Sequence, residues 1–168
     1  MVIGRIGDDA AGAAVRRALT GVATRLAVDD ALATGPYVEL ANGAVGADRG
    51  ANAALSLEDV LPLEADAVLV SGYVDLAGAV LEQANARWRA FVATAATRAV
   101  PAGANVLFAN DAEAEQLDVA AFEIAVVTHG PRGATVHRDG RMTRLPPSGD
   151  AMTGAGDRLA GRFLASLL

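Results

Sequence analysis

The chain has 168 residues, enough for one domain with its own core, and its 14 basic residues against 20 acidic ones give a formal net charge of −6. An acidic chain without a basic cluster is a poor partner for nucleic acid or an anionic membrane, so we expect neither as a partner. Cysteine is absent, which excludes disulfides and cysteine metal sites, and the spacing of the two histidines does not suit a zinc centre.

The first half of the chain alternates short helical patterns with β-prone runs. Apolar residues recur at helical spacing over 10–19, and Asp8 or Asp9 is placed to cap that helix. Ser56 and Asp59 have the spacing of a helix-start box. This half has four β-prone runs, 22–28, 36–41, 44–47 and 67–71. The runs 36–41 and 44–47 flank Asn42-Gly43, which is a hairpin turn signal.

The second half opens with an Ala-rich stretch over 76–97. Its larger apolar residues, from Leu81 to Phe91, recur at steps of three and four residues, which predicts one long helix with Trp88 on its apolar face. A closing helix is predicted over 156–168. Between the two helices lie four β-prone runs, 105–109, 124–128, 134–138 and 141–145. The run 124–128 is apolar enough to be a strand buried on both faces.

Two motifs in the last quarter of the chain form a layout typical of phosphate handling, and a third motif lies upstream of them. The turn Gly154-Ala155-Gly156-Asp157 opens the closing helix, where N–H groups and the helix dipole favour an anion and an acid can accept a hydroxyl proton. The stretch from Thr128 to Gly133 holds glycines that allow close backbone approach, and Asn110 stands three residues before Glu113. Taken alone, the same motifs are also an ordinary helix start, a strand-to-strand turn and a capping box.

In these motifs and their order the chain resembles the PfkB, or ribokinase-like, family of carbohydrate kinases. Three further segments are similar to the sugar-proximal half of that family: Gly4 to Gly12, Asp48 to Leu55 and Leu69 to Tyr73. The resemblance implies an α/β fold with a mainly parallel central sheet flanked by helices and a small β-lid remnant. It implies a single domain over 1–168 that is incomplete relative to the family, because we expect its first strand and sugar loop, a central strand between Tyr73 and Asn110, and its last helices to be missing.

The resemblance also implies an ATP- and Mg²⁺-dependent kinase that phosphorylates a hydroxyl of a sugar, a nucleoside or a similar small molecule. Asp157 would be the general base, and the turn residues Gly154, Ala155 and Gly156 would form an anion hole. Asn110 and Glu113 would arrange the Mg²⁺ and its water. The residues that would contact the nucleotide are Thr128, Gly130, Gly133 and Thr153.

Two departures from the family pattern support an alternative. Ala151-Met152-Thr153 stands where the family usually has Asp-Thr-Thr, and Arg158 follows Asp157 where the family prefers a small residue. The alternative is a shortened, catalytically inactive relative that at most binds nucleotide and self-associates as a homo-oligomer through exposed sheet edges. Because no apolar run approaches the ~18 residues of a membrane span and no secretory signal pattern opens the chain, we expect a cytoplasmic protein.

Overall fold

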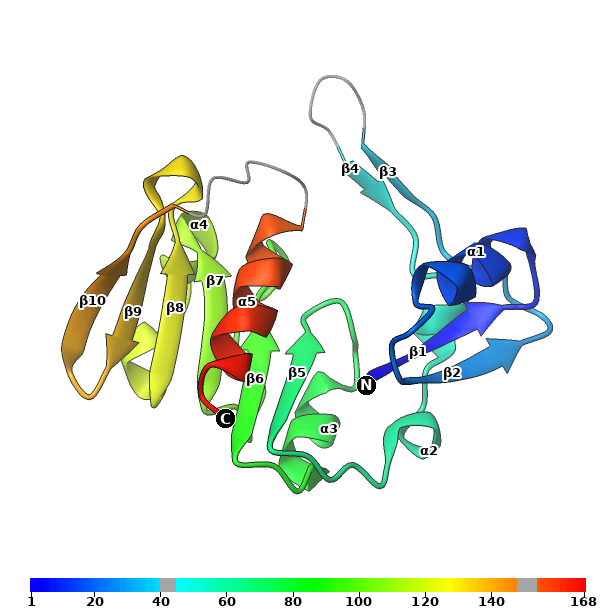
Figure 1. Cartoon of the computed structure of the whole chain (residues 1–168), viewed down its shortest axis with the longest axis horizontal. Coiled ribbons are helices and arrows are strands. Elements are labelled where there is room, and N and C mark those ends of the chain that lie inside the picture. Colours follow the sequence, from blue (N-terminus) through cyan, green and yellow to red (C-terminus); the bar gives the residue numbers. More distant parts are fainter. Residues whose placement is uncertain (40–44, 148–153) are drawn as a thin grey trace. The chain divides into compact units, whose positions relative to one another are not determined.

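In the computed structural model (Figure 1), the described residues are 1–39, 45–147 and 154–168. These residues form two compact units. The first unit comprises 1–62 and 74–76, and the second comprises 63–73 and 77–168. The interpretation of the whole chain as one ribokinase-like domain stays a prediction.

The first unit is built on a parallel pair of strands. β1 (Val2–Gly7) and β2 (Thr24–Asp29) pair along their whole length, and α1 (Ala10–Ala18) connects them. The Asp9 side chain caps α1 by accepting the Gly12 N–H at 2.7 Å. The helix and its cap, both predicted from the sequence, are therefore confirmed.

A hairpin and two short helices complete the first unit. β3 (Tyr37–Glu39) pairs antiparallel with β4 (Val45–Ala47), in agreement with a small β-lid, whereas the predicted Asn42-Gly43 turn lies outside the described residues. The two helices, η1 and α2, span Ala51–Ala54 and Leu57–Val60. Ser56 and Asp59 form the predicted capping box at the start of α2, with each backbone N–H donating to the other side chain.

In chain order, the elements of the second unit are β5 (Ala67–Ser71), α3 (Ala77–Gln83), β6 (Trp88–Val92), β7 (Val106–Asn110), α4 (Asp111–Ala114), η2 (Val119–Ala121), β8 (Ile124–Thr128), η3 (Gly130–Arg132), β9 (Ala134–Arg138), β10 (Arg141–Leu145) and α5 (Ala155–Ala165). The strands form one six-stranded sheet in the order β10-β9-β8-β7-β6-β5. β5 to β8 are parallel, and β9 and β10 are antiparallel to their neighbours. The sheet is thus mainly parallel, as predicted.

Helices pack against the strands of this sheet. Ala160 and Leu164 of α5 are buried against residues of β6 to β9, and Phe163 meets Phe108 edge to face with the ring centroids 5.9 Å apart. Figure 1 shows α5 running opposite to β6, β7 and β8, so its first turn lies at the edge where these strands end. α3 packs against β5 and β6. Among the helices that the structure describes, none is long and apolar enough to cross a membrane.

The prediction of one long helix over 76–97 is wrong. α3 ends at Gln83, and Trp88–Val92 forms β6 between β5 and β7. Trp88, Ala90 and Val92 pack on the α5 side, while the intervening Phe91 is buried outside that cluster, which is the alternation of a strand. Aromatic and β-branched residues suit a buried, pleated strand, and here this preference outweighs the helical tendency of the nearby alanines. The central strand that we expected to be missing is present.

Candidate functional site

The candidate site lies at the edge of the second unit where the parallel strands end. Asn110 is the last residue of β7 and Thr128 the last residue of β8, and the two are register partners. The Thr128 hydroxyl donates to the Ala109 carbonyl oxygen at 3.4 Å. In open α/β sheets, ligands bind outside the carboxyl ends of the strands. The structure therefore brings two of the predicted motifs together at an edge suited to a ligand.

Asn110 and Glu113 form a reciprocal capping box at the start of α4. The Glu113 N–H donates to Asn110 Oδ1 at 3.0 Å, and the Asn110 N–H donates to Glu113 Oε2 at 2.9 Å. The box uses one carboxylate oxygen of Glu113, and a carboxylate has a second oxygen that can accept from a Mg²⁺-bound water. Over the described ranges, no group of three or more His, Asp or Glu side chains could hold a metal alone. The pair fits an ion that takes most of its ligands from water and phosphate.

A tight turn at 129–133 joins β8 to β9. It contains the single 3-10 turn η3, and the His129 N–H donates to the Gly133 carbonyl oxygen at 2.8 Å. At Gly133, φ is 91° and an added Cβ would clash with the carbonyl oxygen of Leu145. At Gly130, φ is 57° and no described atom lies within 4 Å of a Cβ position. Backbone packing alone therefore explains Gly133, while the surroundings of Gly130 are open enough for a ligand to approach.

Side chains from this turn converge on Asp111, a residue for which the sequence motifs predict no role. His129 Nδ1 lies 2.5 Å from Asp111 Oδ1, and His129 Nε2 lies 2.8 Å from Thr135 Oγ1. Arg132 Nη2 donates to Asp111 Oδ2 at 2.8 Å. Asp111 and His129 meet because they directly follow the register partners of β7 and β8. This register depends on tertiary pairing, so no local sequence signal marks the cluster.

The glycine turn opens α5 in a left-handed conformation. Gly154 has φ 80° and ψ 9° and accepts the Arg158 N–H at 3.0 Å, the first bond of the helix. The N–H groups of Gly154, Ala155, Gly156 and Asp157 consequently have no partner within the helix. Such groups, together with the positive end of the helix dipole, can bind an anion.

Two charged side chains flank this turn. Asp157 is exposed in the first turn of α5. A Cβ added at Gly154 would lie 3.7 Å from an Arg158 guanidinium nitrogen and 3.9 Å from Asp157 Oδ2. An acid and a cation thus stand beside the same backbone turn. The predicted nucleotide contact Thr153 lies outside the described residues.

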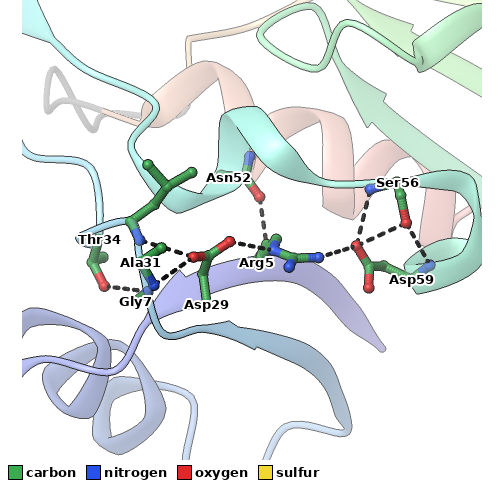
Figure 2. A network of polar contacts seen from close by, with 9 residues as sticks. Arg5, Gly7, Asp29, Ala31, Thr34, Asn52, Ser56 and Asp59 are labelled. Carbon is green, nitrogen blue, oxygen red and sulfur yellow. Dashed lines mark hydrogen bonds and ion pairs between the residues drawn. The ribbon is translucent and has the colours of Figure 1, made fainter.

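The polar residues of the first unit form a network of their own (Figure 2). The Arg5 guanidinium donates from Nε to Asp29 and from Nη1 to Asp59, each at 3.0 Å. The Arg5 backbone N–H donates to Asn52 Oδ1 at 3.0 Å. One arginine of β1 therefore connects the end of β2, η1 and α2.

Three acids of the first unit, Asp9, Asp29 and Asp59, have hydrogen-bond partners that favour their ionised form. The N–H groups of Leu32 and Ala31 lower the pKa of Asp29, and Arg5 lowers it further. The pKa of Asp59 is lowered first by the Ser56 N–H and then by Arg5. In the same way, the N–H groups of Gly12 and Thr34 lower the pKa of Asp9. These acids have structural partners that account for their positions.

Solved structures similar to this chain include sugar and nucleoside kinases. A fructokinase from Vibrio cholerae O395 in fructose-, ADP- and calcium-bound form is 20% identical, with a TM-score of 0.79 over 98% of this chain and 69% of the fructokinase. A ribokinase from Thermotoga maritima is 18% identical, with a TM-score of 0.77 over 97% of this chain and 66% of the ribokinase. An adenosine kinase from Schistosoma mansoni in complex with tubercidin is 18% identical, with a TM-score of 0.73 over 98% of this chain and 65% of the kinase.

No protein-family model matches the sequence, and no curated protein matches it either. At sequence identities of 18 to 20%, these similarities show the fold alone, and they show it over nearly the whole chain. The chain is an α/β protein with the same fold as these sugar and nucleoside kinases. That fold is the ribokinase-like fold of the PfkB kinases, as the sequence motifs predicted.

Proposed function

We propose that the chain is an ATP-dependent kinase that transfers the γ-phosphate to a hydroxyl of a sugar, a nucleoside or a similar small molecule. One observation carries the proposal: Asn110 and Thr128 are neighbours at the carboxyl edge of the sheet, and the glycine-opened start of α5 lies at the same edge. Phosphoryl transfer needs positioning and charge stabilisation more than covalent chemistry, and this edge carries groups suited to both. The fructose and ADP of the V. cholerae fructokinase support the choice of substrates.

In the proposed reaction Asp157 is the general base. Its carboxylate takes the proton of the substrate hydroxyl while the hydroxyl oxygen bonds to the γ-phosphorus of ATP. The bond from that phosphorus to the bridging oxygen breaks, and ADP leaves. The N–H groups of Gly154, Ala155 and Gly156 stabilise the negative charge on the transferring phosphoryl oxygens.

The nucleotide is proposed to lie along the turn that follows β8, with Thr128, Gly130 and Gly133 lining its phosphates and ribose and Thr153 contributing a hydroxyl. Mg²⁺, when bound, neutralises charge on the phosphates. Asn110 and Glu113 would hold it through its water ligands, since this ion gives up its hydration shell reluctantly. ATP as the phosphate donor suits the cytoplasm, where we propose that the chain works.

A second candidate function is nucleotide binding without turnover, in a protein that self-associates. Arg158 favours it, because its guanidinium lies beside Gly154 at the turn where the phosphoryl group would be transferred. An arginine can hold a phosphate by charge-assisted hydrogen bonds without supporting its transfer. This candidate predicts Mg-ATP binding, no ADP release, and a species larger than the monomer by light scattering.

The two candidates are separated by measuring ADP release with Mg-ATP and a panel of sugars and nucleosides. For a kinase we expect a hydroxyl-dependent signal that Asp157→Asn lowers by about 10²- to 10⁴-fold while nucleotide affinity is kept, because the variant removes only the proton acceptor. Glu123→Gln is the matched control. Glu123 is exposed and directly precedes the first residue of β8, at the opposite end of this strand from Thr128. ADP release that is equal in the parent and in Asp157→Asn would contradict the kinase.

A further inference from the structure

The side chain of His129 joins the turn after β8 to the start of α4. Its Nδ1 lies 2.5 Å from Asp111 Oδ1, and its Nε2 lies 2.8 Å from Thr135 Oγ1. A carboxylate only accepts hydrogen bonds, so Nδ1 donates to Asp111 and the Thr135 hydroxyl pairs with the second nitrogen. The imidazole is held at both nitrogens, and it cannot rotate without breaking both contacts.

His129 also closes the turn through its backbone. Its N–H donates to the Gly133 carbonyl oxygen at 2.8 Å, and its carbonyl oxygen accepts the Arg132 N–H at 3.2 Å. The same residue therefore fixes the shape of the turn and attaches the turn to Asp111. Asp111 directly follows Asn110, whose side chain caps α4 together with Glu113.

The two links from this turn to Asp111 differ in their exposure to water. The His129 side chain is 18% exposed, whereas the Arg132 side chain is 68% exposed. Exposed ion pairs contribute little because water and salt screen them. Asp111, which both links share, is 47% exposed. We therefore expect the better-shielded histidine link to be the stronger coupling between the turn and α4, with the arginine link as a natural control for it.

We propose that His129 is a positioning residue that couples the nucleotide turn 129–133 to the Asn110–Glu113 pair through Asp111. The inference rests on the proposed function, since it assigns the coupling a role in binding Mg-ATP. With the link in place, the turn that approaches the phosphates and the pair that holds the metal waters keep one relative position. Without it, each must be ordered separately when Mg-ATP binds.

The coupling is tested first in the nucleotide-free protein, by amide hydrogen exchange. His129→Ala is expected to speed amide exchange at Gly133, within the turn, and at Glu113, which does not touch His129. Each rate should rise by about fivefold or more relative to the core amide of Val126. Arg132→Ala should leave Glu113 nearly unchanged. An unchanged Glu113 amide in His129→Ala would overturn the coupling, whatever the chain does with ATP.

Two conservative variants then identify the contact that matters for Mg-ATP. In His129→Asn the side-chain amide can place an N–H donor near the position of Nδ1, toward Asp111. In His129→Gln the longer side chain can place its amide near the position of Nε2, toward Thr135. We expect His129→Ala to raise the KM for ATP by about 10- to 100-fold with a smaller change in kcat, and His129→Asn to recover more of the affinity than His129→Gln. The conservative variants keep the test decisive if the alanine variant folds poorly.

Each outcome has one meaning. Faster exchange at Glu113 with rescue by Asn supports the positioning role. Rescue by Gln alone would show that the ring supports β9 and not α4, and would overturn the proposal. If the parent protein binds no Mg-ATP, the proposed function fails and the binding role of His129 fails with it, while the exchange experiment still decides whether the coupling exists.

Discussion

Gly133 passes so close to Leu145 that the last residue of β10 leaves no room for a side chain at 133. An added Cβ would clash with the Leu145 carbonyl oxygen and lie 2.9 Å from the carbonyl carbon of Pro146. The φ of 91° is itself in a region that L-residues rarely adopt. Both constraints act in the free protein, so the fold itself requires glycine at this position of the predicted nucleotide motif.

Gly133→Ala is therefore expected to lower the free energy of unfolding by about 2–4 kcal/mol, through strain and overpacking. Gly130→Ala, at a position with open space, should cost only about 1 kcal/mol for its left-handed backbone. Urea unfolding of both variants measures the difference. Equal losses would show that the contact with Leu145 does not determine the requirement for glycine.

The packing of α5 on β6 is tested through Trp88, the single tryptophan of the chain. Leu164 is buried in the same cluster as Trp88, so Leu164→Ala should cost about 2–5 kcal/mol and shift the tryptophan emission to the red. Leu168→Ala is the control, because Leu168 is 72% exposed and its substitution should stay within about 0.5 kcal/mol. A red emission maximum in the parent protein would contradict a buried Trp88 in β6.

The acid network of the first unit predicts a pH dependence. The pKa values of Asp29 and Asp59 are lowered in the folded state, by N–H donors and by Arg5. A lowered folded-state pKa stabilises the fold above the unfolded value of about 3.9, and this stabilisation is lost as the pH falls through the folded pKa. Thermal unfolding from pH 7 to pH 2 should show a fall in Tm at the acid end.

Asp29→Asn provides the matched comparison, because it removes the titration and keeps the shape of the side chain. We expect this variant to be less stable than the parent at pH 7, and we expect the difference in Tm to narrow as the pH falls through the folded-state pKa of Asp29, where the parent's carboxylate becomes protonated. Parallel Tm curves for the two proteins would mean that Asp29 does not contribute to the acid loss.

Glu113 allows its capping role to be separated from a role in metal binding. Gln is as good a partner as Glu in a capping box, so Glu113→Gln should change the free energy of unfolding by no more than about 0.5 kcal/mol. The variant loses a charge beside the proposed Mg²⁺ site, so the stabilisation by Mg-ATP should shrink. Equal stabilisation of parent and variant by Mg-ATP would restrict Glu113 to capping.

Local patterns predicted much of this structure because their physics is local. The caps at Asp9 and Asn110 bring together residues three positions apart, and the apolar run of β8 indicates a strand buried on both faces. The spacing of apolar residues gave a wrong prediction at Trp88, where steps of three and four residues matched a helix although Trp88–Val92 forms a strand. The bond between Asp111 and His129 depends on the pairing of β7 with β8, and single-sequence patterns do not carry that information.

The proposed nucleotide site is tested most directly by thermal unfolding with and without saturating Mg-ATP, with Glu113→Gln alongside. At 100 times its dissociation constant, a ligand adds about 2.7 kcal/mol, which is a rise of several degrees in Tm for a domain of this size. We predict this rise in the parent and a smaller one in the variant. A cooperatively unfolding parent with no rise in Tm would contradict a nucleotide site at the ends of β7 and β8.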